Sequence, residues 1–201
     1  RMEGAGRALD FRLPLPGLHN AANAGGVAIV LMRLGFPPAE IARTFERFAG
    51  IRRRQEVVGE FRGIVVVDDF AHHPTAVRET IRAVRDRYPD RRIVAVFEPR
   101  SNTSRRKVFQ REFTAALSGA DEVVLAGVFG AEKIPPEERL SPEEVAAELR
   151  ASGRPAHVIP EVDGIVTRLA ETCRAGDLVL VMSNGGFGGI QEKLKKALSP
   201  G

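Results

Sequence analysis

Five short apolar runs, rich in valine and isoleucine, recur along the chain from about residue 60 to the end. Each run is continuous rather than alternating with polar residues, which is typical of strands buried on both faces of a parallel sheet. The segments between the runs carry apolar residues at helical spacing. The pattern therefore predicts alternating strands and helices in an α/β layer fold. The expected strands are Ile64–Val67, Ile93–Phe97, Glu122–Ala126, His157–Ile159 and Leu178–Met182.

The helices between these strands can also be located. Val77, Ile81 and Val84 fall on one helical face after the first strand. Another helix begins at Ser141, an N-cap serine followed by a proline and two acidic residues. Because such strand–helix–strand crossovers are right-handed, we expect a Rossmann-like, mostly parallel sheet with helices on both faces.

The first fifty residues follow a different pattern. Small apolar residues over 21–34 predict a helix packed closely on a neighbour, and a pair of prolines at 37 opens a second helix. Two helices and a short leading strand bury too little surface for a good core of their own. We therefore expect residues 1–50 to be a helical tail of a preceding domain and residues 51–201 to form a second domain. The boundary is expected at residues 49–52, with glycine as the hinge.

Composition and charge exclude several classes of function. The chain has 30 Lys and Arg against 26 Asp and Glu, one Tyr and no Trp, so it lacks the stacking aromatics of a nucleic-acid binder. No apolar run is long enough to span a membrane. The single cysteine, Cys173, rules out an internal disulfide and favours a reducing cytoplasm. We expect its thiol to be buried and inert.

The most informative motif is Val-Val-Val-Asp-Asp-Phe-Ala-His-His-Pro, which ends at Pro74. Its two acids stand at the carboxyl end of an expected parallel strand, where ligands collect in α/β sheets. An aspartate there can accept hydrogen bonds from ribose hydroxyls, and a histidine can donate to a phosphate or pack on a base. In the alternative interpretation Asp69 caps the next helix and His72 is structural. The motif alone leaves both interpretations open.

Two earlier segments carry polar groups that suit a nucleotide. Asn20 and Asn23 lie on one side of a helix's first turn, and their amides both donate and accept, as an adenine edge requires. An arginine of the run Arg52–Arg54, beside a domain junction, can reach a phosphate. Each segment has a plainer alternative, because Asn20 alone suits an N-cap and a basic run suits a solvated turn.

Polar loops follow the second and the last expected strands. In Glu-Pro-Arg-Ser-Asn-Thr, Arg100 can hold a substrate carboxylate in a bidentate pair, and the hydroxyl and amide groups after it offer further partners. The glycine-rich turn over 183–189 can bind an anion through its backbone amides. Close packing of a strand on a helix explains such glycines equally well.

Taken in this order and spacing, the motifs resemble the Mur ligases across essentially the whole chain. The asparagine pair, the arginine after a glycine hinge and Asp-Phe-Ala-His-His-Pro form that family's series over its central and C-terminal domains. Asp-Asp-Phe-Ala-His-His-Pro followed by Glu-Pro-Arg-Ser-Asn-Thr is most similar to the branch that joins L-Ala-γ-D-Glu-meso-diaminopimelate to UDP-N-acetylmuramate. The branch that adds L-alanine shares the first motif, typically differs at the second, and is the nearest alternative.

The resemblance implies a role for each matching position. Asn20 and Asn23 are expected to contact adenine, Arg54 the ATP phosphates and Asp69 the ribose, with His72 close to the nucleotide. The residues expected to face the peptide are Arg100, Ser101, Asn102, Ser183 and Asn184. The implied cofactors are ATP and Mg²⁺, and the implied partners are UDP-N-acetylmuramate and the murein tripeptide, without nucleic acid or membrane.

The resemblance also implies a mechanism that this chain does not complete. ATP phosphorylates the lactyl carboxylate of UDP-N-acetylmuramate, and the amine of the peptide displaces phosphate from the acyl phosphate. The family's phosphate loop, magnesium ligands and UDP-sugar domain have no counterpart here. We therefore expect a fragment, a tail of the central ATP-binding domain joined to the C-terminal substrate-binding domain, that is inactive alone and carries no assigned catalytic residue or metal ligand.

Two alternatives belong to other classes. A non-catalytic nucleotide-binding module fits the absence of a phosphate loop. A dinucleotide-dependent dehydrogenase is suggested by the late glycines, but its glycine fingerprint belongs after the first strand of the sheet, not the last.

Overall fold

The computed structural model describes residues 2–4 and 7–199, and the chain divides into two compact units, Arg1–Arg52 and Arg53–Gly201. The division falls close to Gly50, the predicted hinge. Each unit is described by itself below. Within the part of the chain that the structure describes, no helix is both long and apolar enough to cross a membrane.

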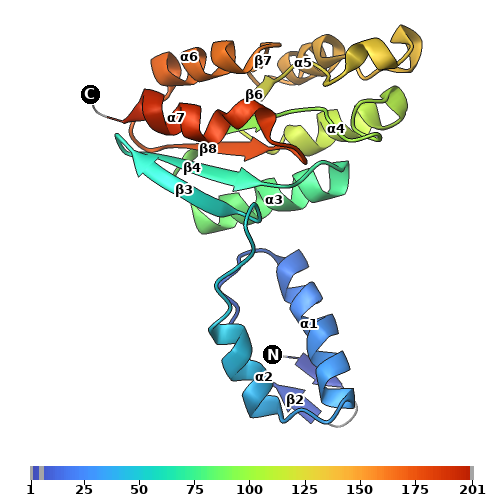
Figure 1. Ribbon diagram of the computed structural model, residues 1–201, viewed down its shortest axis with the longest axis vertical. Coiled ribbons are helices and arrows are strands. Elements are labelled where there is room, and N and C mark those ends of the chain that lie inside the picture. Colours follow the sequence, from blue (N-terminus) through green and yellow to red (C-terminus); the bar gives the residue numbers. More distant parts are fainter. Residues whose placement is uncertain (1, 5–6, 200–201) are drawn as a thin grey trace. The chain divides into compact units, whose positions relative to one another are not determined.

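The second unit is built on a six-stranded sheet in the order β3-β4-β8-β5-β6-β7 (Figure 1). All five predicted strands are present and pair in parallel, which confirms the predicted fold class. They are β4 (Ile64–Asp69), β5 (Arg92–Phe97), β6 (Glu122–Leu125), β7 (Ala156–Val158) and β8 (Asp177–Met182). β4, β6 and β8 are buried along their whole length, as continuous apolar runs predict.

Helices cover both faces of this sheet, as predicted. One face packs against α3 (Pro74–Arg87), α4 (Gln110–Leu117) and α5 (Pro142–Ala151). The other packs against α6 (Val162–Thr172) and α7 (Ile190–Leu198). α5 begins as predicted, since the hydroxyl of Ser141 accepts from the backbone N–H of Glu144 at 3.1 Å. Short 3-10 helices complete the unit: η1 (Lys107–Phe109), η2 (Ala131–Lys133), η3 (Pro136–Glu138) and η4 (Phe187–Gly189).

One edge strand, β3 (Glu56–Phe61), escaped the sequence pattern. It pairs antiparallel with β4 and is irregular between Val57 and Gly59. The hairpin turn between the two strands consists of Arg62 and Gly63, which have φ of 52° and 78°. Two consecutive positive φ values give the turn that matches the twist of a two-residue hairpin, and glycine reaches this region without strain.

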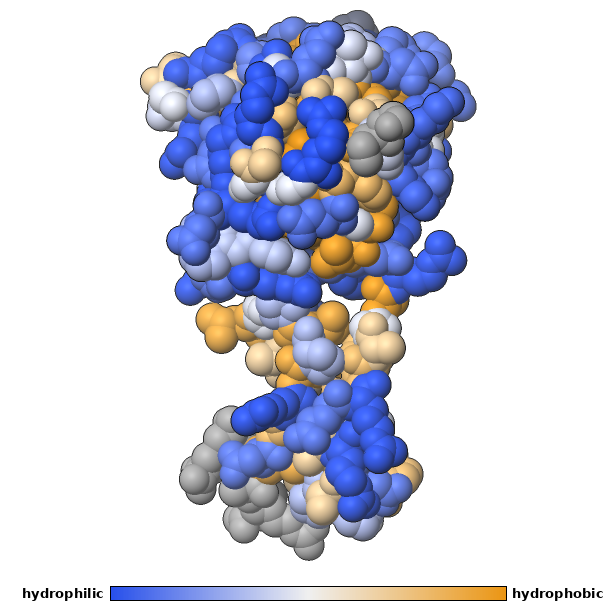
Figure 2. All heavy atoms as spheres, turned by 90° about the vertical axis from the view of Figure 1, so that its left-hand side faces the viewer, coloured by the Kyte–Doolittle hydropathy of each residue, from blue (hydrophilic) through white to orange (hydrophobic). Residues whose placement is uncertain are grey.

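The first unit contains a short hairpin, β1 (Met2–Gly4) with β2 (Arg7–Leu9), and two helices, α1 (Leu18–Arg33) and α2 (Pro38–Glu46). Both helices were predicted. Their shared core is small, with Leu9, Ala28 and Ile41 as its buried members. Most of the large exposed hydrophobic residues of the protein lie in this unit, where they reach the surface (Figure 2). They are Leu18, Val27, Ile29, Val30, Leu34, Phe36, Phe48 and Ile51.

The strand order creates a reversal of topology around β8. From β4 the chain runs through α3 past the position of β8 to β5, and then outward through α4 and α5 to β7. α6 brings it back to the centre on the opposite face, as β8. At its carboxyl end β8 therefore continues toward α7 on one face, whereas β4 and β5 on either side continue toward the other face. Such reversals open crevices at the carboxyl edge where ligands bind.

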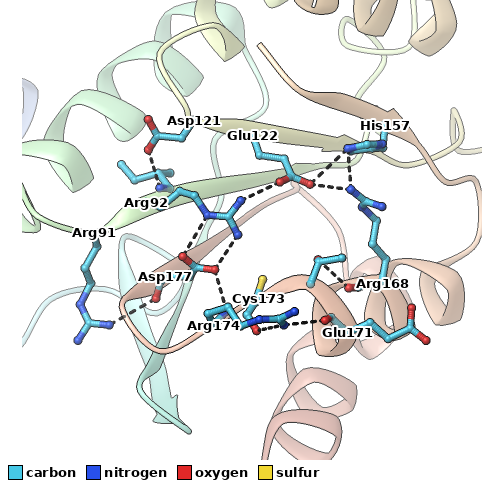
Figure 3. Close-up of polar contacts among 12 residues, drawn as sticks. Arg91, Arg92, Asp121, Glu122, His157, Arg168, Glu171, Cys173, Arg174 and Asp177 are labelled. Carbon is cyan, nitrogen blue, oxygen red and sulfur yellow. Dashed lines mark hydrogen bonds and ion pairs between the residues drawn. The ribbon is translucent and has the colours of Figure 1, made fainter.

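The amino edge of the same sheet carries a network of charged side chains (Figure 3). Arg92 donates from Nε and Nη2 to the two carboxylate oxygens of Asp177, at 3.1 and 2.7 Å, and from Nη1 to Glu122 at 2.9 Å. Arg168 donates to Glu122 at 3.0 Å and to Nε2 of His157 at 2.6 Å. Although burial alone would raise the pKa of Asp177, its hydrogen bonds from Arg92 lower that pKa. The network joins the first residues of β5, β6 and β8.

Cys173 lies behind this network, at the end of α6, and is fully buried. Burial raises the pKa of its thiol to about 11. A buried thiol that stays protonated is a poor nucleophile, so the structure gives it the inert character that the sequence predicted.

Candidate functional site

The carboxyl edge around β8 carries a row of polar side chains on the face covered by α6 and α7. In the sheet register Met182 lies opposite Asp69 on one side and Phe97 on the other. Ser183 and Glu98 follow directly, and alternation along a strand turns both toward that face. The hydroxyl of Ser183, which is fully buried, donates to Oε2 of Glu98 at 2.5 Å. The ends of adjacent strands are thus joined under the glycine-rich turn.

Arg53 connects the start of this unit to the turn after β8. Its Nε donates to Oδ2 of Asp68 at 3.2 Å, and its Nη2 donates to the carbonyl oxygens of Ser183 and Gly185 at 2.5 and 2.7 Å. Asp68 is 4% exposed, so this ion pair is largely shielded from water. Arg53 therefore fixes the turn by two hydrogen bonds and ties it to the end of β4 by a third, a role that the sequence pattern did not assign to it.

Arg100 lies on the other side of the turn, at the end of β5. Its Nη1 is 3.5 Å from Oε1 of Glu98, and its Cζ lies 3.6 Å from the ring centroid of Phe129. Glu98 therefore contacts both Ser183 and Arg100. The carboxylate and the ring hold the guanidinium in place while part of the side chain stays exposed, which suits a group that must meet an anionic ligand.

The predicted peptide-facing residues after Arg100 are mostly engaged within their own loop. The hydroxyl of Ser101 accepts from the N–H of Ser104 at 3.0 Å and donates to its hydroxyl at 2.8 Å. Oδ1 of Asn102 accepts from Arg105 at 2.7 Å, although the residue itself is exposed. Asn184 is half-buried, and its Oδ1 is buried without a hydrogen-bond partner. An unpaired buried acceptor is costly, and an incoming N–H or O–H donor would satisfy it.

The side chain of Asp69 points into the protein. It is 2% exposed, and its carboxylate accepts from the backbone N–H groups of Gln55 at 2.9 Å and Ala71 at 2.7 Å. Burial raises the pKa of Asp69 even though these two amide donors act to lower it. Asp69 does not have the helix-capping role considered as its alternative, because the N-cap of α3 is His73. In this geometry Asp69 organises the loop, and a ribose contact would require its hydrogen bonds to rearrange.

Arg54 and His72 lie together at the surface near Phe70. Arg54 is exposed, and its Cζ lies 5.4 Å from the ring centroid of Phe70. His72 is half-buried, its ring centroid lies 5.1 Å from the same ring, and its Nδ1 is 2.8 Å from the carbonyl oxygen of Phe70. An exposed cation and a half-buried imidazole, each against the ring of Phe70, are compatible with the predicted contact to a nucleotide.

The asparagine pair belongs to the first unit, in the opening turns of α1. Asn20 is half-buried and donates from its side chain to the carbonyl oxygen of Pro16 at 2.7 Å, whereas Asn23 is exposed. The N-cap of the helix is Gly17, so Asn20 does not have the capping role considered as its alternative. The adenine contact stays a prediction.

No cluster of three or more His, Cys, Asp or Glu side chains that could hold a metal ion occurs among the residues described. Two carboxylates of the carboxyl edge are paired with arginines, Asp68 with Arg53 and Glu98 with Arg100, and the third, Asp69, accepts from backbone amides. The side chains of this unit therefore do not offer a ready Mg²⁺ site.

A family model described as the Mur ligase, glutamate ligase domain matches residues 53–185, which is most of the second unit. The chain belongs to the Mur ligase family. The matched span contains the carboxyl-edge row, the loops after β4 and β5 and the first three residues of the turn after β8.

Individual relatives point to two branches of this family. A UDP-N-acetylmuramate–L-alanyl-γ-D-glutamyl-meso-2,6-diaminoheptandioate ligase of Escherichia coli K12 is 41% identical over 192 residues, covering 94% of this chain and 40% of that protein. A UDP-N-acetylmuramate–L-alanine ligase of Desulfitobacterium hafniense Y51 is 36% identical over 176 residues, covering 88% and 39%. A murein peptide ligase from Psychrobacter arcticus 273-4, whose crystal structure is known, superposes with a TM-score of 0.72 at 32% identity, covering 94% and 38%. The chain thus spans about 40% of the length of the curated relatives it matches.

Proposed function

We propose that the chain is part of a cytoplasmic, ATP-dependent ligase that joins L-Ala-γ-D-Glu-meso-diaminopimelate to UDP-N-acetylmuramate in peptidoglycan recycling, through an acyl phosphate. The observation that carries the proposal is the arrangement at the turn after β8, where Glu98 and Phe129 hold a partly exposed Arg100 and the Oδ1 atom of Asn184 is buried without a hydrogen-bond partner. An oriented guanidinium group and an unpaired acceptor at a topological switch point suit an anionic peptide. The identity of 41% with the tripeptide-adding ligase supports the choice of branch.

In this proposal the residues of the second unit bind and orient rather than transfer groups. Arg100 pairs with a carboxylate of the peptide, and the orphan oxygen of Asn184 accepts from a peptide N–H. Arg54 and His72 face the ATP phosphates, Asn20 and Asn23 face adenine, and Asp69 holds the loop that presents His72. Mg²⁺ would neutralise charge on the transferring phosphoryl group, and we expect its ligands outside this chain.

The alternative substrate is L-alanine, and the 36% identity with an alanine-adding ligase supports this alternative. A free amino acid needs one carboxylate-binding residue, whereas the tripeptide needs several spaced contacts. Nuclear magnetic resonance of the ¹⁵N-labelled chain, titrated separately with the tripeptide and with L-alanine, separates the two. We expect the tripeptide to shift the amides of Arg100 and Asn184 at lower concentration than L-alanine does.

A chimaera tests the reaction itself. This chain would replace the matching 40% of the Escherichia coli ligase, and ligation of UDP-N-acetylmuramate to each amine would be measured. Product formed with the tripeptide supports the proposal. Product formed only with L-alanine would assign the chain to the alanine-adding branch of the family. Tighter binding of L-alanine than of the tripeptide in the isolated chain would reject the proposal even if the chimaera failed to fold.

A further inference from the structure

A hollow of about 300 Å³ lies at the carboxyl edge of the sheet, beyond the row described above. Its walls come from the loop after β6, from the segment after β7 and from the start of α5. Most of its lining residues are apolar, Val128, Leu140 and Val158 among them, and three polar side chains join them: Arg139, Ser141 and Glu143. A small apolar cavity with a few converging polar groups has the usual character of a ligand subsite.

A single loop separates this hollow from the candidate site. Val128 lines the hollow, and the next residue, Phe129, stacks on Arg100. The backbone N–H of Phe129 donates to Pro99 at 3.0 Å, and its carbonyl oxygen accepts from Arg105 at 3.2 Å. A ligand bound at Arg100 therefore needs to extend past only this loop to reach the hollow.

The far wall is held in place by hydrogen bonds to the same region. The backbone N–H of Leu140 donates to Arg105 at 2.9 Å, and that of Ser141 donates to the side chain of Gln110 at 2.9 Å. Nη2 of Arg139 donates to the carbonyl oxygen of Ile134 at 2.7 Å. The cavity is thus preformed, which lowers the entropic cost of binding.

The charged groups of the hollow are unpaired in the part of the chain that the structure describes. Nε of Arg139 is buried without a partner, and no carboxylate lies within ion-pairing distance of its guanidinium. Glu143 is exposed and has one polar side-chain contact, the hydroxyl of Ser141 at 3.5 Å. Nearby charges are paired elsewhere, Glu138 with Arg106 and Glu144 with Lys107. A cation and a carboxylate in one apolar hollow, unpaired with each other, match a ligand that carries both charges.

We infer that the hollow binds the zwitterionic amino-acid end of the peptide substrate, with its carboxylate on Arg139 and its ammonium on Glu143. The inference rests on the proposed function. A tripeptide that reacts through its amino terminus leaves its third residue to extend along the sheet edge. The free end of meso-diaminopimelate carries a carboxylate and an ammonium on one carbon, joined by methylene groups to the rest. The methylene groups would pack on the apolar lining residues. L-alanine is too short to reach them.

Three ligands titrated into the ¹⁵N-labelled chain test this inference. Free meso-diaminopimelate is expected to shift the amides of Val128, Arg139 and Glu143, and the dipeptide L-Ala-γ-D-Glu those near Arg100 and Asn184. The tripeptide is expected to shift both sets. A tripeptide that shifts only the set near Arg100 would overturn the inference and leave the proposed function standing. A tripeptide that shifts neither set would overturn both.

Two substitutions remove the charges one at a time. Arg139→Gln and Glu143→Gln should each weaken tripeptide binding about ten-fold and leave dipeptide binding unchanged, since charge-assisted contacts of this kind are worth about 1.4 kcal/mol or more. Arg111→Gln and Glu112→Gln are matched controls, because both residues are exposed and neither lines the hollow. Glu143→Gln is the variant less exposed to a folding defect, since the Glu143 side chain is exposed and its one polar contact is the Ser141 hydroxyl at 3.5 Å. An unchanged ratio of tripeptide to dipeptide affinity in both variants would contradict the inference.

Discussion

Gly185 leaves the space that the side chain of Arg100 occupies. A β-carbon at position 185 would lie 2.0 Å from Nε and 2.2 Å from Cδ of Arg100. The next glycine along the turn, Gly186, has nothing within 4 Å of the corresponding position. The glycine-rich turn therefore has one position set by contact with a functional side chain and a neighbouring position that is free.

We predict that Gly185→Ala displaces Arg100 and imitates its loss. The added methyl group cannot share space with the guanidinium, so the arginine must leave Glu98 and Phe129. Binding of the tripeptide by the chain, measured by calorimetry, should weaken about ten-fold, as expected for one lost charge-assisted pair.

Gly186→Ala is the matched control for this variant and should bind as the wild type does. Arg100→Ala combined with Gly185→Ala should be no weaker than Arg100→Ala alone, because the methyl group acts only through the arginine. Additive losses in the double variant would mean that Gly185 serves the ligand directly.

Arg53 gives a second prediction, this time on stability. Arg53→Ala leaves the buried Asp68 carboxylate and two carbonyl oxygens without their donor, and we expect a loss of about 1–3 kcal/mol in the free energy of unfolding. The backbone at position 53 has φ of 59° in either case, so strain does not change between arginine and alanine. Urea unfolding measures the difference.

The neighbouring residue provides the comparison. Arg54 is exposed and makes no hydrogen bond that the structure records among its described residues, so Arg54→Ala should change stability by less than about 0.5 kcal/mol. If the two variants lost equal stability, the assignment of Arg53 as the residue that fixes the turn would be wrong.

The sequence predicted the sheet because burial dictates it. A strand covered on both faces must be apolar along its whole length, so the runs that became β4, β5, β6 and β8 were visible without any structural knowledge. β7 (Ala156–Val158) is a short edge strand that is only partly buried, and the predicted run His157–Ile159 is displaced from it by one residue. β3 was not visible, because an edge strand is half exposed and this one carries a glycine and charged residues. Its position depends on pairing with β4, which no local pattern encodes.

The candidate site was located by motif but not resolved into roles. Of the adjacent pairs Arg53–Arg54 and Asp68–Asp69, the sequence favoured the second member of each for ligand contact. The structure turns Arg53 onto Asp68 and buries Asp69 against backbone amides. Which of two adjacent strand residues faces a given side of the sheet depends on the register of side-chain alternation. A positive φ, as at Arg53, also changes the direction of the side chain. Phe129 was missed for a related reason, since nothing near it in sequence indicates that it lies on Arg100.

Asp69 supplies a third prediction, which separates its structural role from a ribose contact. Asp69→Asn replaces an acceptor oxygen by an amide NH₂ group that must face one of two backbone N–H donors. The chain should lose about 1–3 kcal/mol of unfolding free energy in the absence of any nucleotide. Asp86→Asn, at an exposed position on α3, is the control and should unfold at the wild-type urea concentration. The same result for Asp69→Asn would show that its carboxylate does not hold the loop.

The last prediction concerns the pH dependence of stability, and it arises at the amino edge of the sheet. Burial, and then the neighbouring Arg168 guanidinium, lower the pKa of His157 below its ordinary value of 6.5, although Glu122 acts in the opposite direction. Because Arg168 can only donate, Nε2 of His157 must accept and the ring must be neutral. The imidazole of His157 is therefore protonated at a lower pH in the folded state than in the unfolded chain.

The sign of the effect follows from this difference in proton binding. The contribution of His157 to stability is present above pH 6.5, the pKa of the unfolded chain, and is lost as the pH falls toward the lower pKa of the folded state. The difference in unfolding free energy between the wild type and His157→Gln should therefore shrink as the pH is lowered from about 7.5 to about 5. Urea unfolding across this range measures the difference, and nuclear magnetic resonance titration of the His157 ring supplies the folded pKa. A ring that titrates at or above 6.5, or a difference that grows in acid, would mean that Arg168 does not hold the imidazole neutral.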